Sequence, residues 1–208
     1  MKTKTFAALC CMAALFAACE KNDVEPTAGT ENGHDYVDLG LPSGLKWATC
    51  NVGATKPEGY GYYYAWGETT PKSSYLENNY SYSANPDVLP LDRDAAHANW
   101  GGAWRMPTET EWTELCEKCT RTWTTRNGVK GIEIKSKING NSIFLPAAGF
   151  RSSNDVFYTG HYGCYWSSSL DADAPNNAKF VEFRSENNDI FRNYYSRVCG
   201  QSVRAVME

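Results

Sequence analysis

The sequence has no run of basic residues and only three histidines. Lys and Arg together number 20 against 24 Asp and Glu, so the formal net charge is −4 at pH 7. Nucleic-acid binding depends largely on clustered basic side chains that neutralise phosphates, so we expect no nucleic-acid partner. His34, His97 and His161 lie far apart in the sequence, and no second cysteine pair is present to complete a zinc site. We therefore expect no bound metal and no other cofactor.

Common catalytic and calcium-binding motifs are absent as well. The chain contains neither a Gly-x-Ser-x-Gly nucleophile elbow nor a phosphate-binding loop. The segment 171–177 has oxygen-bearing side chains but lacks the glycine and the ligand spacing of an EF-hand loop. Acidic residues are spread along the whole chain, so the sequence does not single out a carboxylate pair for hydrolysis. We expect a protein that is not an enzyme, and an uncharacterised hydrolase is an alternative.

Cysteine does not occur in a pattern that would make it reactive. Cys116-Glu-Lys-Cys119 is formally a Cys-x-x-Cys sequence, but it falls near the C-terminal end of an expected helix, where the dipole does not stabilise a thiolate. Outside the cytoplasm cysteines are commonly paired, although sequence alone does not determine the connectivity. We expect the disulfides Cys50–Cys119 and Cys164–Cys199, each worth roughly 2–4 kcal/mol, unless an anaerobic habitat keeps them reduced.

No hydrophobic run is long enough to cross a bilayer. Two lysines precede the apolar stretch from Phe6 to Ala18, an order typical of a secretory signal and too short for a spanning helix of about 20 residues. The stretch ends in small residues followed by Cys19 and resembles a lipobox, with Phe16 where leucine is usual. We expect a lipoprotein signal peptide at 1–18, and ordinary secretion is the alternative. Its removal takes away two lysines and changes the net charge from −4 to −6.

The segment after Cys19 is polar, contains Pro and Gly and has no hydrophobic periodicity. This composition is typical of a flexible tether, so we assign residues 19–33 to a linker and residues 34–207 to one folded domain. Acidic residues directly after the cysteine resemble the surface-export signal of some Gram-negative lipoproteins. We expect an outer-membrane lipoprotein that faces the cell exterior, and the periplasmic face is the alternative.

The segment 94–112 combines a turn, a helix cap and three tryptophans. Thr108 and Glu111 form the Thr-x-x-Glu pattern of a capping box, which predicts a helix that begins at Thr108. Large aromatic side chains are mostly buried, so we expect the tryptophans here to lie in the core. The structural residues that we single out are Trp100, Trp104, Arg105, Thr108, Glu111, Trp112 and Trp166.

Short strands are expected on both sides of this helix. Asn127-Gly128 and Asn139-Gly140 favour tight hairpin turns, because Asn and Gly both tolerate positive φ. The polar stretch 67–93 predicts a long loop. The pattern predicts an α+β fold with a mostly antiparallel sheet, one or two helices and long loops. The expected strands are 36–39, 45–52, 59–67, 129–137, 142–147, 164–169, 178–183 and 202–206.

Several of these segments together resemble a known family. The string from Trp100 to Trp112, WGGAWRMPTETEW, is similar to the signature of the Fibrobacter succinogenes major paralogous domain, which is related to the C-type-lectin-like and formylglycine-generating-enzyme folds. The resemblance implies a C-type-lectin-like or formylglycine-generating-enzyme-like fold that binds ligands at its last strands and loops. It does not extend to formylglycine chemistry, because Cys164 and Cys199 are not closely spaced, nor to calcium-mediated sugar binding, because the Glu-Pro-Asn, Gln-Pro-Asp and Trp-Asn-Asp triplets are absent. The other similar segments are 36–53, 63–69, 141–149, 165–169 and 200–206.

Two late segments, 152–162 and 185–197, combine Asn, Tyr, Ser, Asp, Phe, His and Arg. Adaptable hydrogen-bonding groups beside rigid rings are typical of binding loops on a fixed sheet. The same residue types would also arise from adenine mutagenesis of Asn codons, so diversified loops are one interpretation and an ordinary polar surface is the other. The candidate ligand-binding residues are Asn154, Asp155, Phe157, Tyr158, His161, Tyr162, Asn187, Asn188, Asp189, Arg192, Tyr194 and Tyr195.

These features together predict a binding function, and two alternative functions remain open. We expect a lipid-anchored, surface-exposed, adhesin-like module that recognises a glycan or protein ligand through the late loops. The first alternative is a structural or accessory component of a fimbria-like cell-surface assembly. The second is the hydrolase mentioned above.

Overall fold

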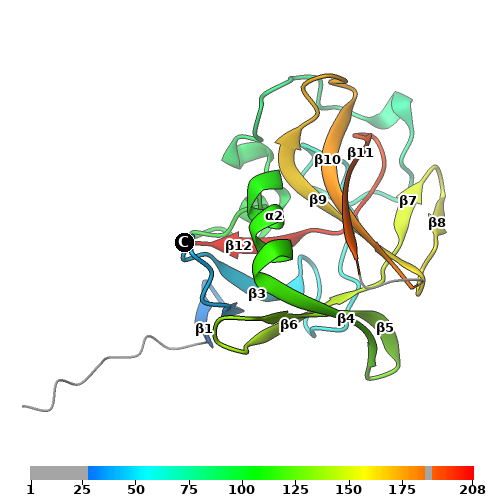
Figure 1. Cartoon of the computed structure of the whole chain (residues 1–208). Helices are drawn as coiled ribbons and strands as arrows, with labels where there is room; N and C mark the ends of the chain where they lie inside the picture. Colours follow the sequence, from blue (N-terminus) through cyan, green and yellow to red (C-terminus); the bar gives the residue numbers. More distant parts are fainter. Residues whose placement is uncertain (1–27, 186–188) are drawn as a thin grey trace, which may run out of the picture.

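The computed structural model describes residues 28–185 and 189–208, so the expected signal peptide and Cys19 lie outside the described residues. Short helices and many antiparallel strands confirm the α+β class (Figure 1). In chain order the elements are β1 (Ala28–Glu31), β2 (His34–Asp38), β3 (Lys46–Asn51), η1 (Glu77–Asn79), η2 (Leu91–Arg93), α1 (Ala95–Trp100), α2 (Glu109–Lys118), β4 (Cys119–Arg126), β5 (Val129–Ser136), β6 (Ser142–Pro146), β7 (Phe150–Ser152), β8 (Asp155–Phe157), β9 (Tyr162–Leu170), β10 (Asn177–Arg184), β11 (Ile190–Ser196) and β12 (Arg204–Met207).

The strands form four antiparallel groups within the described part of the chain. One sheet has the order β1-β2-β3-β12, so the first and the last described strands belong to the same sheet. Two three-stranded sheets have the orders β11-β10-β9 and β4-β5-β6, and β7 pairs with β8 as a hairpin. Figure 1 shows α2 beside the sheet that contains β9 and β10, and α2 contacts β9, β10 and β11.

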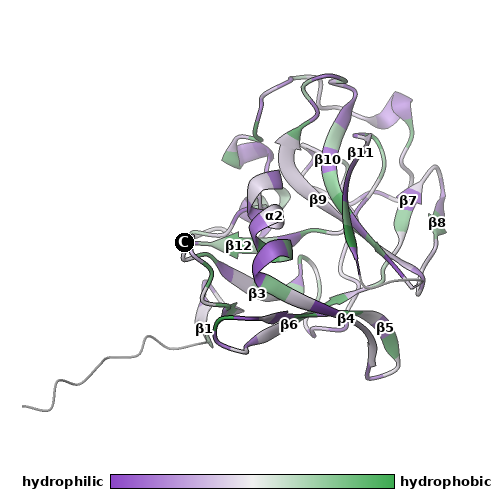
Figure 2. Ribbon diagram, viewed as in Figure 1, coloured by the Kyte–Doolittle hydropathy of each residue, from purple (hydrophilic) through white to green (hydrophobic). Residues whose placement is uncertain are grey.

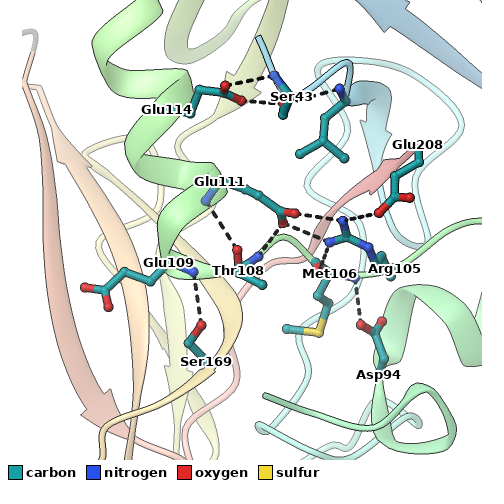
Figure 3. A network of polar contacts seen from close by, with 11 residues as sticks. Ser43, Asp94, Arg105, Met106, Thr108, Glu109, Glu111, Glu114, Ser169 and Glu208 are labelled. Atoms are coloured by element: carbon teal, nitrogen blue, oxygen red, sulfur yellow. Dashed lines mark hydrogen bonds and ion pairs between the residues drawn. The ribbon is translucent and has the colours of Figure 1, made fainter. Parts of the chain in front are cut away.

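Helix α2 begins where the capping box predicts. The Thr108 hydroxyl accepts a hydrogen bond from the Glu111 N–H at 3.3 Å, and the Glu111 carboxylate accepts one from the Thr108 N–H at 2.7 Å. The same carboxylate also accepts hydrogen bonds from both terminal nitrogens of Arg105, at 2.8 and 2.7 Å (Figure 3). Because the Arg105 backbone exchanges hydrogen bonds with Val206 in β12, the start of α2 is joined to the last strand.

The tryptophans of the 94–112 segment are core residues, as expected. Trp104 and Trp112 are fully buried and Trp100 is nearly so. Trp112 packs between Trp47 of β3 and Tyr165 of β9, with ring centroids 4.8 and 6.1 Å away. Figure 2 shows the corresponding alternation of hydrophilic and hydrophobic residues around α2, which is the pattern of a helix with one buried face.

A fully buried arginine lies at one end of the β3-β12 pairing, where Arg204 is opposite Asn51. Arg204 donates to the Ala48, Thr49 and Phe144 carbonyls and to Asn51 Oδ1, at distances of 2.7 to 3.0 Å. All of these acceptors are neutral, so carbonyl dipoles rather than a carboxylate stabilise the guanidinium. Burial lowers the pKa of Arg204 from its ordinary value. The side chain thereby links β3 and β6 to the last strand.

Three expectations about chain organisation were wrong. The linker does not extend to residue 33, because β1 (Ala28–Glu31) pairs in register with β2. The stretch 59–67 is not a strand but an irregular segment with a single bridge from Tyr64 to Gln201. The segment 185–197 is not simply a loop, because β11 (Ile190–Ser196) extends the sheet beside β10. Polar composition did not indicate β1 and β11, which are ordered by pairing with the neighbouring strands β2 and β10, and the aromatic composition of 59–67 did not produce a paired strand.

Candidate functional site

Exposed aromatic side chains gather where the β7-β8 hairpin meets the edge strand β11. Phe157, Tyr158 and Tyr195 are 40%, 53% and 40% exposed, which is unusual for rings of this size. Phe150 of β7 and Tyr162 of β9 are half-buried beside them. We call these five residues the aromatic platform. Figure 1 shows the hairpin and β11 as neighbours, although they are far apart in the sequence.

The platform rings touch one another in a continuous series. Tyr158 stacks on Tyr162 with centroids 4.5 Å apart and an interplanar angle of 15°. Phe150 stacks on Phe157 at 5.6 Å and meets Tyr195 edge-on at 5.4 Å. These separations are those of favourable aromatic pairs. The sequence segments 150–162 and 190–196 therefore present one shared surface.

The platform is anchored in the core through Tyr195. The Tyr195 ring meets Phe180 of β10 at 6.0 Å, and Phe180 meets the fully buried Trp166 at 6.0 Å. Partial burial raises the pKa of the Tyr195 hydroxyl, so this group stays protonated at neutral pH and can donate a hydrogen bond. The exposed rings are thus held by packed rings beneath them.

The hairpin under the platform is tied to two other segments. The Arg151 and Gly200 backbones exchange hydrogen bonds of 2.7 and 2.9 Å, and those of Ser153 and Tyr75 exchange bonds of 3.0 and 2.8 Å. A side chain at position 200 would come within 2.6 Å of the Tyr75 ring, so the close approach requires glycine there. These contacts fix the hairpin, and a fixed hairpin presents its rings with little loss of entropy on binding.

A cation borders the platform. The Arg184 guanidinium lies 5.0 Å from the Tyr162 centroid and 5.8 Å from that of Phe191, which is 41% exposed. Arg184 Nε is also 2.5 Å from Glu182 Oε1. Cation–π contacts of this length are attractive. Arg184 therefore joins the exposed Phe191 ring to the platform and places a positive charge at its margin.

Strand β11 divides the predicted binding residues between two faces. Side chains alternate along a strand, and Tyr195 contacts Phe150, whereas Arg192 donates to the Thr113 hydroxyl of α2 at 2.9 Å. Tyr194 lies 5.6 Å from the Lys179 ammonium, on the same face as Arg192. Arg192 and Tyr194 therefore do not belong to the platform, although they are adjacent to it in the sequence.

The remaining predicted residues lie around the platform or away from it. Asn154 is exposed in the β7-β8 turn, Asp155 is exposed at the start of β8, and His161 is exposed in the turn before β9. Asp189 is 3.7 Å from Arg121 of β4 and so points toward another sheet. Asn187 and Asn188 lie outside the described residues.

Sequence reasoning missed three members of this surface: Phe150, Arg184 and Phe191. The sequence does contain a signal for Phe191, which is the strand period of residues 190–196, IFRNYYS. A period of two puts residues 191, 193 and 195 on one face. The polar composition of this segment led to a loop prediction instead. Phe150 and Arg184 carry no local signal, because only the packing of β7, β9 and β10 brings them to the platform.

A small cavity of about 30 Å³ lies directly beneath the platform and has room for about one water molecule. Among its lining residues are Cys164, Glu182 and Gln201. The Oε1 atom of Gln201 is buried without a hydrogen-bond partner. Burial raises the pKa of the Cys164 thiol, so this sulfur is neutral and not a ready nucleophile.

Neither expected disulfide is formed. Cys50, Cys116, Cys119, Cys164 and Cys199 are all free thiols. Cys119 is buried at the end of α2, whereas Cys50 is partly exposed in β3 beside the Thr49 hydroxyl. Cys199 interacts with the Ser152 side chain, not with Cys164. Burial raises the pKa of Cys119 to about 11 and also raises that of Cys116, so the Cys-x-x-Cys thiols are protonated at neutral pH.

The described part of the chain contains neither a metal-binding cluster nor a membrane-spanning helix. Within residues 28–185 and 189–208, no group of three or more His, Cys, Asp or Glu side chains could hold a metal ion. No helix in this part of the chain is long and apolar enough to cross a membrane. Comparison with protein-family models, with curated proteins and with solved structures gives no match. The fold and the platform are therefore the basis of any functional assignment.

Proposed function

We propose that the protein is a lipid-anchored, surface-exposed binding module that recognises a glycan or protein ligand through the aromatic platform. The observation that carries the proposal is the exposure of Phe157, Tyr158 and Tyr195, which are joined ring to ring on a fixed hairpin and strand. Contiguous exposed apolar patches with polar groups around them are characteristic of interaction sites.

The chemistry of the platform suits ligands that have both apolar faces and hydroxyl groups. Aromatic side chains give large contact areas, and tyrosine adds a hydroxyl that donates or accepts. A sugar ring can stack its carbon–hydrogen face on Tyr158, while Arg184 and the exposed Asn154 and Asp155 at the margin offer polar partners. A protein ligand could pack an exposed segment with aromatic or aliphatic side chains against the same rings.

The proposal includes a family and an anchor. The Trp100–Trp112 motif supports membership of the Fibrobacter succinogenes major paralogous domain family and a C-type-lectin-like or formylglycine-generating-enzyme-like fold. Its residues build the junction of α2 with β12, and the platform lies on late strands, where the resemblance implies a ligand surface. The lipobox-like sequence that ends at Cys19 supports an outer-membrane anchor with the domain on the outside.

A role in a cell-surface assembly is the second candidate. Strand β11 is the edge of its sheet and pairs only with β10 among the described strands. Its residues 191–195 are all exposed and include no proline. An unprotected edge strand is a template for pairing with a strand of another subunit. This role predicts concentration-dependent association that a proline at Asn193 reduces.

Glycan and protein arrays test the binding proposal. The fragment of residues 28–208 should bind a limited set of glycans or proteins, and substitution of Phe157 by serine should remove that binding. Binding that persists at full strength in the Phe157→Ser variant would place the site elsewhere. The absence of any binding to either kind of array would shift support to the assembly role.

A further inference from the structure

A second cavity is built from the long 67–93 loop and the residues that follow β11. Its volume is about 360 Å³, which is within the range of small-molecule sites. None of its lining residues belongs to the aromatic platform. All of them except Val198 have polar groups, and the full lining is Glu77, Tyr80, Ser81, Tyr82, Ser83, Asn85, Asn176, Arg197 and Val198.

The cavity contains a buried arginine whose charge has no carboxylate partner. Arg197 is only 5% exposed, and none of the described carboxylates forms an ion pair with it. Its terminal nitrogens donate to the Tyr82 and Ala84 carbonyls and to Asn85 Oδ1, at 2.9 to 3.0 Å. All three acceptors are neutral. Its Nε is buried without any hydrogen-bond partner.

Two aromatic rings hold this guanidinium in place. The Arg197 Cζ atom lies 5.4 Å from the centroid of the Trp66 ring and 5.5 Å from the centroid of the Tyr80 ring. The Tyr80 hydroxyl in turn donates to the Trp66 carbonyl at 2.7 Å. The guanidinium is therefore fixed before any ligand arrives, which reduces the entropy that a ligand must offset.

Neutral acceptors and rings offset only part of the cost of burying the Arg197 charge, and its Nε has no acceptor, so an anion that enters the cavity reduces the remaining cost. Arginine is especially suited to planar carboxylates, because its fork of N–H donors matches their geometry. The serine hydroxyls and asparagine amides of the same cavity provide partners for hydroxyl groups. We propose that this cavity binds a carboxylate-bearing sugar of the uronic acid type, with the sugar carboxylate directed toward Arg197.

The charge of Glu77 should affect the affinity of the cavity for an anion. Glu77 is exposed and lines the same cavity, so its negative charge opposes an anionic ligand. Neither the Glu77 carboxylate nor the Asn176 amide takes part in a described hydrogen bond, so both can be changed without disturbing Arg197. Glu77→Gln should strengthen binding of the acidic sugar by about threefold and Asn176→Asp should weaken it by about threefold, because each changes a nearby charge by one unit.

The test is calorimetric titration of the full chain, solubilised in detergent, with D-glucuronate, D-glucose and acetate. We expect glucuronate to bind at least about tenfold more tightly than glucose, which lacks the carboxylate, and than acetate, which lacks the ring. The Glu77→Gln and Asn176→Asp variants should move its Kd in opposite directions. Thermal melting of each variant confirms that the fold is intact.

Three results would overturn the assignment. Equal affinity for glucuronate and glucose would show that the carboxylate is not recognised, and equal affinity for acetate would show that the sugar is not. An unchanged Kd in both charge variants would place the ligand outside this cavity. The platform variant Tyr158→Asn separates the two sites: it should leave glucuronate affinity unchanged, and a loss of affinity would move the ligand to the platform.

Discussion

Glu111 connects three parts of the polar network in Figure 3: the helix cap, the Arg105 guanidinium and, through Arg105, the end of β12. Its side chain is only 17% exposed. Burial alone would raise the pKa of the carboxyl group, but hydrogen bonds from Arg105 and from the Thr108 N–H outweigh burial and lower it. The ionised form is therefore the one that stabilises the fold.

Replacement of Glu111 by glutamine should reduce stability at neutral pH by about 1–2 kcal/mol, since it removes the charge-assisted bonds to Arg105 and Thr108. A carboxyl whose folded pKa is depressed contributes stability above its unfolded pKa and loses it as pH falls through the folded value. The stability gap between the Glu111→Gln variant and the natural chain should thus close as the pH falls below the ordinary value of 4.5. Denaturant titrations at a series of pH values measure this gap, and a gap that is constant with pH would contradict the account.

Arg204 differs from Arg105 in that its buried guanidinium donates only to neutral acceptors and not to a carboxylate. Replacement by methionine leaves the Ala48, Thr49 and Phe144 carbonyls without this donor. We expect Arg204→Met to lower the free energy of unfolding by about 3–5 kcal/mol, and Arg204→Lys to cost less because it keeps one donor group. Urea denaturation at pH 7 compares the three chains. A methionine variant as stable as the natural chain would show that the buried network is dispensable.

At the scale of elements, the sequence predicted those with strong local signals. The Thr108 cap fixed the start of α2, and Asn127-Gly128 and Asn139-Gly140 marked the turns on either side of β5. Strands β1 and β11 were missed because polar residues fill them, and their backbones are ordered by pairing with β2 and β10. Both strands did carry a local signal, because Asn32-Gly33 between β1 and β2 is a hairpin dipeptide with φ values of 47° and 82°, and residues 190–196 have the period of two of a strand.

The β4-β5 turn allows a clean test of turn chemistry. Arg126 pairs with Val129, and the two residues between them, Asn127 and Gly128, have φ values of 49° and 82°. No atom lies within 4 Å of a side chain added at Gly128, so an alanine there causes backbone strain only. We expect Gly128→Ala to lower stability by about 1 kcal/mol and Gly128→Asn by less. Equal stability of all three chains in thermal melting would contradict the left-handed turn.

At the scale of the whole molecule, part of the candidate site was predicted and part was not. Phe157, Tyr158, Tyr162 and Tyr195 were expected as ligand-binding residues on composition alone, and the structure brings them together. Arg192 and Tyr194 were expected with them, but the strand period turns these two to the opposite face of β11, where Arg192 contacts α2 and Tyr194 contacts Lys179 of β10. The composition of a segment indicates which residue types are available, whereas the pairing of β11 determines which of them share a face.

Lipidation at Cys19 should determine the cell fraction in which the protein is found. If Cys19 carries acyl chains, each buried methylene contributes about 0.8 kcal/mol and the protein stays with the membrane fraction. Cys19→Ala should release it into the soluble fraction, as measured by cell fractionation. Protease treatment of intact cells then distinguishes the outer face from the periplasmic face. A Cys19→Ala protein that remains in the membrane fraction would contradict lipidation at this position.

The most direct test of the central claim compares two tyrosines that are equally exposed but lie in different places. Tyr158 and Tyr194 are each 53% exposed, yet only Tyr158 belongs to the platform. Tyr158→Asn keeps a residue type that tolerates the φ of 58° at this position, and Tyr194→Asn is the matched control. The account predicts that affinity for an array-identified ligand falls at least about tenfold in the first variant, as expected for loss of an aromatic anchor, and is unchanged in the second. A loss confined to Tyr194→Asn, or no loss in either variant, would contradict the platform as the binding site.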